Sequence, residues 1–237
     1  MTNTIFIIPP SEGKNTWWNL WKESTFLSFS QPKIIAENAT EKDLKCSWKR
    51  YEQWISLNKD INKSSSEILR SIERYSWVMY HAIDYTGMTE AWREFFENNF
   101  LILSGMYGIL TPLNMIGNYK LPIETKWLYD FWWEQILDAI DSMNIEYVVN
   151  LLPMSYAKLI YGRNKTLEKQ YTEKRKFQII NINFLKPDGW KMAHGVKKIK
   201  GEWIKSICNK KISDYRDFWG EIVERENNII DINIVVD

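Results

Sequence analysis

The segment Phe100–Trp133 limits the possible folds more than any other part of the chain. It begins with a short apolar run, Phe100–Leu103, whose length is typical of a buried strand. Ser104–Gly105 follows directly, and glycine allows close backbone approach or a positive φ at that point. Apolar residues at helical spacing then extend over Leu128–Ala139. The pattern predicts a strand, a polar loop and a helix, either as plain core structure or as a rigid strand that presents a functional loop.

A similar change from apolar to polar sequence occurs near the start of the chain. Thr4–Ile8 is apolar and β-branched, which predicts a buried strand, and the Pro9–Pro10 pair then ends strand pairing. The next segment, Ser11–Lys14, supplies a hydroxyl, a carboxylate, a glycine and an ammonium group. These groups suit an anion-binding loop, although an exposed turn at a strand end has the same composition. The segment is not a Walker loop, because the first glycine and the Lys-Ser/Thr ending are missing.

The other predicted elements favour one mixed domain. With 237 residues, 45% of them hydrophobic, the chain can bury a large core. Strands and helices follow one another without a regular βαβ rhythm, so we expect an α+β (mixed α/β) class with a mixed central sheet, surrounding helices and a single domain over residues 1–237. Further predicted strands are Trp77–Tyr80, Glu146–Leu152, Phe177–Leu185 and Ile230–Val236, and predicted helices include Thr40–Leu57 and Glu90–Asn98.

The C-terminal region combines a turn with a lysine-rich helix. In Lys186–Gly189, proline fixes φ and glycine closes the turn, so a hairpin partner should follow at Trp190–Ala193. Apolar residues line one face of a predicted helix over Val196–Ile207, and a second helix should extend from Ser213 through Trp219. The first helix carries Lys197, Lys198, Lys200 and Lys205. These lysines suit phosphate binding, and they also suit an ordinary solvated face.

Charge and cysteine content narrow the class of protein. The net charge of +1 excludes a uniformly basic nucleic-acid binder, so any DNA contact would need a local patch. Cys46 and Cys208 are too few for a disulfide framework and suit a reducing compartment. The chain shows no basic segment followed by a long apolar run, and no apolar run long enough to span a bilayer. We therefore expect a cytoplasmic protein with no membrane partner.

Motifs for metals and common cofactors are missing from the sequence. His81, His194 and the two cysteines are far apart and lack the spacing of metal ligands. The chain has no Rossmann glycine fingerprint and no Gly-x-Ser-x-Gly elbow. We therefore expect no metal and no cofactor. Any chemistry would depend on Ser, Tyr, Lys, Asp and Glu, and a lysine desolvated near other cations can titrate near neutrality.

Six segments carry a family resemblance that covers nearly the whole chain. They are PPSEGK after the first strand, RYSWVMYHAIDY from Arg74, LSGMYGILTPLNMIGNYKL from Leu103, LYDFWWEQI, VVNLLPMSYAK and, after the hairpin, VKKIKGEWI. In this order and spacing they resemble the YaaA family of peroxide stress proteins. Some positions depart from the family pattern. Lys200–Gly201 stands where the family usually has Arg-Gly, and lysine cannot make the bidentate fork of arginine to a phosphate. Thr111–Pro112 and Asn114 stand where the family more often has Arg-Pro and Asp.

The resemblance implies a compact mixed α/β domain with a positively charged cleft and a helix-hairpin-helix element. Family members are described as DNA-binding proteins tied to oxidative stress and recombination repair. Carried over residue by residue, the resemblance places the following residues around the cleft: Ser11, Glu12, Lys14, Arg74, Tyr80, Ser104, Tyr107, Tyr119, Lys158, Lys197 and Lys198.

Two classes of function follow from these residues. The first is a DNA-binding module for double-stranded or junction DNA, without sequence specificity, in which Lys197, Lys198, Lys200 and Lys205 hold the phosphate backbone. The second is an enzyme that acts on a small nucleobase, nucleoside or nucleotide through glycosidic-bond or base-modifying chemistry. Its candidate catalytic residues are Glu12, Ser11 and Tyr107, and its candidate substrate- or phosphate-binding residues are Lys14, Arg74, Tyr80, Ser104, Tyr119 and Lys158.

Overall fold

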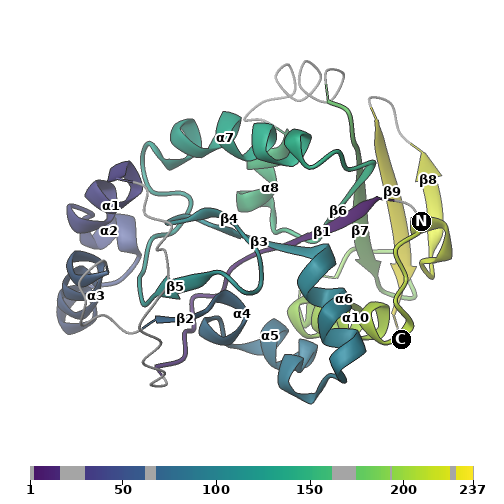
Figure 1. Cartoon of the computed structure of the whole chain (residues 1–237), viewed down its shortest axis with the longest axis horizontal. Coiled ribbons are helices and arrows are strands. Elements are labelled where there is room, and N and C mark those ends of the chain that lie inside the picture. Colours follow the sequence, from purple (N-terminus) through teal and green to yellow (C-terminus); the bar gives the residue numbers. More distant parts are fainter. Residues whose placement is uncertain are drawn as a thin grey trace.

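A mixed sheet of seven strands forms the centre of the molecule (Figure 1). The computed structural model describes residues 3–16, 30–61, 68–161, 175–192, 194–224 and 228–236. Across the sheet the order is β4 (Gly108–Leu110), β3 (Phe100–Ser104), β1 (Thr4–Ile8), β6 (Tyr147–Asn150), β7 (Gln178–Leu185), β9 (Ile229–Val235) and β8 (Glu221–Glu224). The five inner strands pair in parallel, and the edge strands β4 and β8 are antiparallel to their neighbours. The predicted mixed sheet is therefore confirmed.

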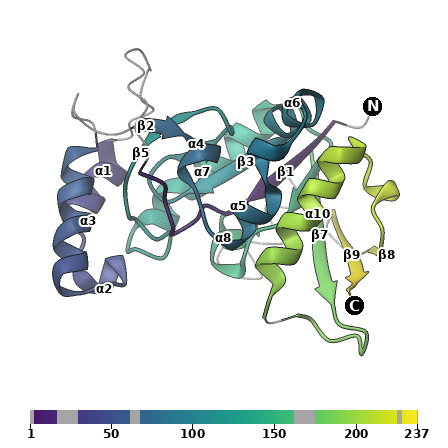
Figure 2. The same ribbon diagram turned by 90° about the horizontal axis from the view of Figure 1, so that it is seen from below.

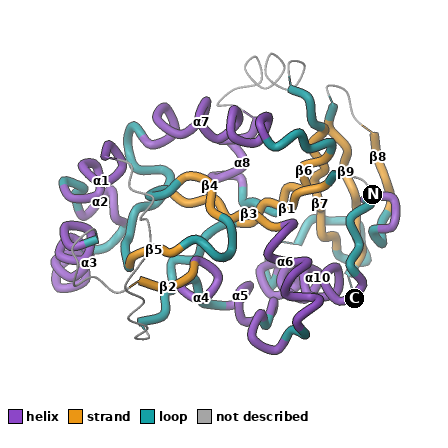
Figure 3. Tube along the Cα trace, viewed as in Figure 1, coloured by secondary structure: helices purple, strands orange, loops and turns teal. Residues whose placement is uncertain are grey.

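Helices cover both faces of this sheet (Figures 1 and 2). One face carries α7 (Leu128–Ser142) and α8 (Met154–Tyr161), and the other carries α5 (Val78–Ile83), α6 (Glu90–Asn99) and α10 (Val196–Lys210). Figure 3 shows the strands as the layer between them. To one side lie α1 (Ser30–Glu37), α2 (Glu41–Leu44) and α3 (Trp48–Asp60), near the two-stranded ladder of β2 (Ile68–Arg70) and β5 (Met115–Gly117).

Short elements complete the described part of the chain. They are α4 (Ser71–Arg74) and the 3-10 turns η1 (Tyr85–Gly87) and η2 (Tyr215–Asp217). The described residues thus form nine α-helices. None of these helices has the length and apolar character needed to cross a membrane.

An aromatic cluster fixes α6 and α10 against the sheet. Phe6 of β1 stacks on Phe100 of β3 with ring centroids 4.6 Å apart, and Phe100 stacks on Phe96 of α6 at 4.4 Å. Trp203 of α10 lies 6.3 Å from Phe6, and all four rings are buried. Such ring pairs add about 0.5–1.5 kcal/mol each beyond the burial of apolar area. The cluster anchors the strand from which the loop at Pro9 leaves the sheet.

Helices α5 and α10 approach so closely that one position has no room for a side chain. A Cβ atom on Gly201 would lie 2.4 Å from the carbonyl oxygen of Met79 and 2.6 Å from the Cβ atom of Ala82. Both distances are shorter than van der Waals contact. Glycine at this position therefore sets the distance between the two helices.

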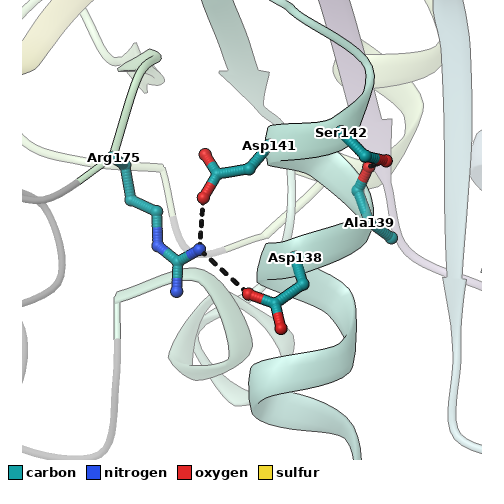
Figure 4. Close-up of polar contacts among 5 residues, drawn as sticks. All are labelled: Asp138, Ala139, Asp141, Ser142 and Arg175. Atoms are coloured by element: carbon teal, nitrogen blue, oxygen red, sulfur yellow. Dashed lines mark hydrogen bonds and ion pairs between the residues drawn. The ribbon is translucent and has the colours of Figure 1, made fainter.

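An ion pair joins the chain entering β7 to α7 (Figure 4). The Arg175 guanidinium donates to Asp141, and its Nη1 atom lies 3.4 Å from a carboxylate oxygen of Asp138. Asp138 and Asp141 are three residues apart, so they share one helix face. Two carboxylates near the C-terminal end of a helix are unfavourable for the helix dipole, and the nearby guanidinium offsets that charge. In the same turn, Ser142 donates a 2.7 Å hydrogen bond to the carbonyl of Ala139.

Two predictions for the first half of the chain need correction. The helix predicted over Thr40–Leu57 is divided into α2 and α3, because Lys45 and Trp48 adopt positive φ angles of 50° and 57°. The strand predicted over Trp77–Tyr80 is wrong, because these residues lead into α5. Their aromatic and β-branched composition favours a strand, but Met79, Tyr80 and Ile83 are buried at helical spacing. Packing against α10 therefore decides the conformation.

The predicted C-terminal arrangement is present only in part. The turn over Lys186–Gly189 is confirmed by a 2.9 Å hydrogen bond from the Gly189 amide to the Lys186 carbonyl, and Leu185 pairs with Lys191 across it. The hairpin is followed by α10. The second helix predicted through Trp219 is wrong, since the chain there forms η2 and then β8. Of the described ranges 175–192 and 194–224, α10 is the one α-helix, so a helix-hairpin-helix element is not shown there.

The contact at Gly201 can be tested by substitution. We expect Gly201→Ala to lower the free energy of unfolding by about 1–3 kcal/mol, because the added methyl group must push α5 and α10 apart. Chemical denaturation measures the change. The matched control is Glu202→Ala on the adjacent exposed position, which breaks only a surface pair with Lys198 and should cost less than about 1 kcal/mol. Equal losses in both variants would contradict the close-contact explanation.

Candidate functional site

A cavity of about 500 Å³ lies at the carboxyl ends of β1 and β6. The chain places β3 on one side of β1 and β6 on the other, so the strand order reverses at β1. Open α/β sheets commonly bind ligands at such a point, because the loops after the two strands leave in different directions. The lining includes residues of both loops, of the segment 119–124 and of helices α5, α8 and α10: Pro9–Glu12, Lys14, Tyr80, Tyr119–Pro122, Glu124, Leu151, Pro153, Ser155, Tyr156, Val196, Lys197 and Lys200.

Backbone pairing holds the loop after β1 in place. Lys14 and Tyr75 form an antiparallel bridge, and the Asn15 amide donates a 2.8 Å hydrogen bond to the Arg74 carbonyl. The buried Arg74 guanidinium donates in return to the Asn15 carbonyl. At the start of the loop, the Tyr80 hydroxyl donates to the Pro9 carbonyl at 2.8 Å. The loop is therefore fixed at both ends although it belongs to no strand.

Trp77 provides a flat wall of the cavity in a strained backbone conformation. Its φ angle is 86°, a value that costs a residue other than glycine about 1–3 kcal/mol. The Ser76 amide donates to the Gly13 carbonyl at 3.0 Å, which holds the indole against the loop. A Cβ atom on Gly13 would lie 2.3 Å from Cδ1 of Trp77, so only glycine permits this contact. Trp77 remains 53% exposed beside the cavity.

The ammonium group of Lys14 lies among aromatic rings. Its Nζ atom is 4.6 Å from the ring centroid of Tyr119, 5.6 Å from that of Trp54 and 5.8 Å from that of Tyr75. It donates one 3.2 Å hydrogen bond to the carbonyl of Ser11. Lys14 as a whole residue is half-buried, and it lines the cavity.

This environment changes the acidity of the Lys14 amine. Burial disfavours the ammonium form, and the positive charges of Lys120 and Arg74 act in the same direction. The Glu12 carboxylate opposes them. Together these effects lower the pKa of Lys14 from 10.5 to about 7. A substantial fraction of the amine is therefore neutral, and able to act as a base or a nucleophile, near pH 7.

Lysines outnumber carboxylates around the cavity. Five lysines and two glutamates line it, and one of each, Lys45 and Glu124, form a surface ion pair of 3.3 Å. Lys120 is only 8% exposed, and Asn58 fixes its backbone through two 3.0 Å hydrogen bonds. Cations held in an enclosed site without matching carboxylates favour an anionic ligand.

Lys200 adds a second amine with altered acidity. It lies in α10 one residue before Gly201, and its Nζ atom donates a 2.8 Å hydrogen bond to the carbonyl of Leu151 after β6. Burial lowers the pKa of Lys200 to about 8. The bond ties α10 to the loop after β6, so Lys200 has a structural role besides its charge.

A network of buried hydroxyl groups holds Tyr119, one of the residues that line the cavity. The Tyr119 hydroxyl lies 2.6 Å from the hydroxyl of Tyr75 and 2.6 Å from that of Ser104. Ser104 also accepts 3.1 Å hydrogen bonds from the amides of Met106 and Tyr107. Burial raises the pKa of Tyr75 and of Tyr119 well above the usual value of 10.0. These phenols therefore stay protonated, and their hydrogen bonds orient the Tyr119 ring at the cavity.

The structure brings together part of the set of residues predicted from the sequence. Those that line the cavity are Ser11, Glu12, Lys14, Tyr80, Tyr119, Lys197 and Lys200. Arg74, Ser104 and Tyr107 are buried outside the lining, and the Tyr107 hydroxyl accepts a 3.1 Å hydrogen bond from the Gly117 amide. Lys158, Lys198 and Lys205 are not among the lining residues, and Lys205 forms a 2.8 Å ion pair with Asp84.

Several residues in or near the cavity could not be selected as site residues from the sequence. The composition around Trp77 predicts a strand, and Lys120 and Tyr156 lie in sequence that predicts a loop and a short helix. The Trp54 ring near Lys14 comes from α3, which is distant in sequence. The one usable signal is position, because Lys120 follows Tyr119 and Tyr156 precedes Lys158 within the segments that carry the family resemblance.

Comparison with known proteins finds one matching family profile and several similar proteins. The profile of a family described as "Peroxide stress protein YaaA" matches residues 5–221. A UPF0246 protein of Rickettsia conorii is 27% identical over 165 residues, which cover 65% of this chain and 62% of that protein. One of Finegoldia magna is 30% identical over 142 residues, covering 59% and 55%. One of Lactobacillus helveticus is 30% identical over 180 residues, covering 70% and 67%. The chain thus spans 55 to 62% of the length of the first two relatives.

The buried amine of Lys14 predicts a stability change that depends on pH. Below about pH 7 the folded and unfolded states both carry the proton, so the full cost of burying the charge is present. Between about pH 7 and 10.5 only the unfolded state keeps the proton, and the free energy of unfolding rises with pH. Lys14→Met removes this cost, so its stability relative to the wild type should be greater at pH 6 than at pH 9.5. Urea denaturation at both pH values, with Lys158→Met on an exposed position as the control, measures the difference. An equal difference at both values would contradict burial of the Lys14 amine.

Proposed function

The chain belongs to the peroxide stress protein YaaA family, and on that premise we propose that it is an enzyme that acts on a nucleobase-bearing anion in the cavity at β1 and β6. The ligand class is a nucleotide, either free or as a unit of a DNA strand. The observation that carries this proposal is the combination of an amine that is partly neutral near pH 7, excess cations and aromatic rings in one cavity of about 500 Å³.

The size of the cavity favours a small ligand. Sites for small molecules are roughly 300–1,000 Å³, and this cavity falls in that range. A base in a duplex would have to leave its stack to enter such a space. The exposed face of Trp77 offers a stacking surface for a flat ring, worth about 1–3 kcal/mol per base.

The charged residues divide into two roles under this proposal. Lys120 and Lys197 contribute positive charge that favours a phosphate group. The exposed carboxylate of Glu12 takes or gives a proton at the reacting group, as a general acid or base. Ser11 lies beside Glu12 on the same fixed loop and is positioned to contact the ligand. Tyr107, Ser104 and Arg74 act indirectly, by holding in place the residues that line the cavity.

A second candidate function is binding of the DNA backbone beside the cavity. Lys197 and Lys198 are exposed in the first turn of α10, and Lys197 also lines the cavity. Phosphates held there would place a strand across the mouth, with little base reading. Lys205 suits this role less well than the sequence suggested, since its ammonium already pairs with Asp84. Backbone binding of this kind does not require a helix-hairpin-helix element.

The nucleotide proposal is tested by binding and turnover together. Calorimetric titration with the four deoxynucleoside 5′-monophosphates, their nucleosides and the free bases should show at least one monophosphate binding about tenfold more tightly than its nucleoside, a difference of about 1.4 kcal/mol. Lys14→Met and Trp77→Ala should each weaken that binding, because they remove a contact of the cavity. Glu12→Gln should keep the binding and lose product formation, measured by chromatography.

The control for these measurements is Lys59→Met, which removes an exposed lysine of α3 outside the lining. Its affinity should equal that of the wild type. The proposal is abandoned if no monophosphate binds, or if Glu12→Gln turns over the identified ligand at the wild-type rate.

The DNA candidate makes a separate prediction about salt. Lys198→Ala should reduce the slope of log affinity against log salt concentration by about one unit, because one phosphate contact is lost. Lys205→Ala should change the slope less, since its charge is paired with Asp84. Fluorescence anisotropy with duplex DNA over a range of salt concentrations measures both slopes. A slope unchanged in Lys198→Ala would argue against phosphate contacts at the start of α10.

A further inference from the structure

We propose that Lys14 is a nucleophile that forms a covalent imine with the aldehyde carbon of a phosphate-bearing deoxyribose. The substrate class is a deoxyribose that has lost its base, either within a DNA strand or as a free sugar phosphate. This inference rests on the proposed function, because loss of a base from a deoxynucleotide leaves the C1′ carbon as an aldehyde in its open-chain form.

The position of the amine supports a nucleophilic role. Lys14 lines the cavity, and one hydrogen bond, to the Ser11 carbonyl, is recorded for its Nζ atom. The rings of Tyr119, Trp54 and Tyr75 surround the same atom but provide no carboxylate partner. Its 3.2 Å hydrogen bond is longer than the 2.8 Å bond by which Lys200 ties α10 to the loop after β6, so the Lys14 amine is held less firmly. The Lys14 amine is kept in an enclosed site that disfavours its charge.

The acidity of the amine fits the same role. A lysine with its usual pKa is almost fully protonated at pH 7 and has no free lone pair. Burial and the charges of Lys120 and Arg74 bring the pKa of Lys14 to about 7, so roughly half of the molecules carry the neutral amine at that pH. Lysines made nucleophilic in this way are the groups that form Schiff bases with carbonyl substrates.

The other lysines of the cavity favour a carbonyl compound that also carries negative charge. Lys120 and Lys197 line the same cavity and are well placed to favour a phosphate. A carbonyl compound that also carries phosphate satisfies both the amine and these charges. A deoxyribose phosphate has that combination, and it is smaller than the nucleotide from which it comes, so it fits the same space.

The reaction is balanced without any further reagent. The Lys14 lone pair attacks the aldehyde carbon, the C=O π electrons move to oxygen, and one proton passes from the nitrogen to that oxygen to give a neutral carbinolamine. A second proton then converts the hydroxyl group into water, which leaves as the nitrogen lone pair forms the C=N bond. The net change is one amine, one aldehyde and one proton giving one protonated imine and one water. Glu12, on the same loop, is positioned to carry the protons.

Lys200 is the alternative amine in the cavity. Its pKa is about 8 and its Nζ atom is held by the Leu151 carbonyl at 2.8 Å, so it is less often neutral and less free to move. Its imine would require breaking the bond that ties α10 to the loop after β6. The geometry therefore favours Lys14, and the experiment must identify the lysine that reacts.

The test traps the imine by reduction. The wild-type protein is incubated with sodium cyanoborohydride and either a labelled oligonucleotide containing one abasic site or 2-deoxyribose 5-phosphate, and the adduct is located by peptide mass spectrometry. We expect a stable adduct on Lys14, at least tenfold more abundant than on any other lysine. Lys14→Arg keeps the positive charge but cannot form the imine, so trapping should fall at least tenfold. Lys59→Met, on an exposed position of α3 outside the lining, should trap as well as the wild type.

The two probes distinguish the sources of the sugar. An adduct with the oligonucleotide alone identifies DNA as the source, and an adduct with the sugar phosphate alone identifies a free metabolite. Mapping to Lys200 or to dispersed surface lysines, or trapping by Lys14→Arg at the wild-type level, would overturn the inference. Because mapping is carried out on the wild type, the result does not depend on the folding of a variant.

Failure of this inference can be told apart from failure of the proposed function. A protein that binds a nucleoside monophosphate by calorimetry but gives no trapped adduct has the proposed ligand class without the Lys14 nucleophile. A protein that neither binds a monophosphate nor gives an adduct lacks both.

Discussion

The antiparallel pairing between the loop after β1 and the segment around Tyr75 is the interaction on which the rest of the site depends. Pro9 and Pro10 end the pairing of β1 within the sheet, so the loop beyond them needs another source of hydrogen bonds. It finds them at Arg74 and Tyr75, which lie just before α5. The same bridge that satisfies the backbone directs the Lys14 side chain toward the rings of Tyr75 and Tyr119. The surroundings that lower the pKa of Lys14 therefore depend on this bridge.

The burial of positive charge in this region works against stability. Lys14, Lys120 and Arg74 interact closely enough that the latter two lower the pKa of the first, and among the groups that influence Lys14 only Glu12 opposes them. Aromatic faces offset part of the desolvation cost, because a cation over a ring gains roughly 0.5–2 kcal/mol. The strained φ angle of Trp77 adds a further cost at the same place. Costs concentrated around one cavity are typical of functional sites, and they favour a ligand that supplies the missing negative charge.

Sequence periodicity predicts the layers of this fold well and the details of the site poorly. The strands over Thr4–Ile8 and Phe100–Leu103 have unambiguous apolar runs, and the class and mixed sheet follow from them. The segment at Trp77 has strand-like composition but forms a helix, because its contacts with α10 outweigh local propensity. The loop residues Ser11, Glu12 and Lys14 could be selected from their position after a strand, as the cavity lining shows. Trp54 could not, since only the tertiary fold brings α3 beside Lys14, and the sole sequence signal for Lys120 is its place next to Tyr119.

The packing of α10 couples the core to the charge of the cavity. The missing side chain at Gly201 lets α10 approach α5, and that approach places the preceding residue, Lys200, on the Leu151 carbonyl. Lys197 lies one turn earlier on the same helix and also lines the cavity. Trp203, on the core side of α10, contacts Phe6 of β1, the strand that leads into the Lys14 loop. The loop after β1 and helix α10, which both bring lysines to the cavity, are therefore positioned by one continuous set of contacts. A change in the spacing of α5 and α10 must alter the distance between Lys200 and the loop after β6. The electrostatic potential that the cavity presents to an anionic ligand changes with that distance.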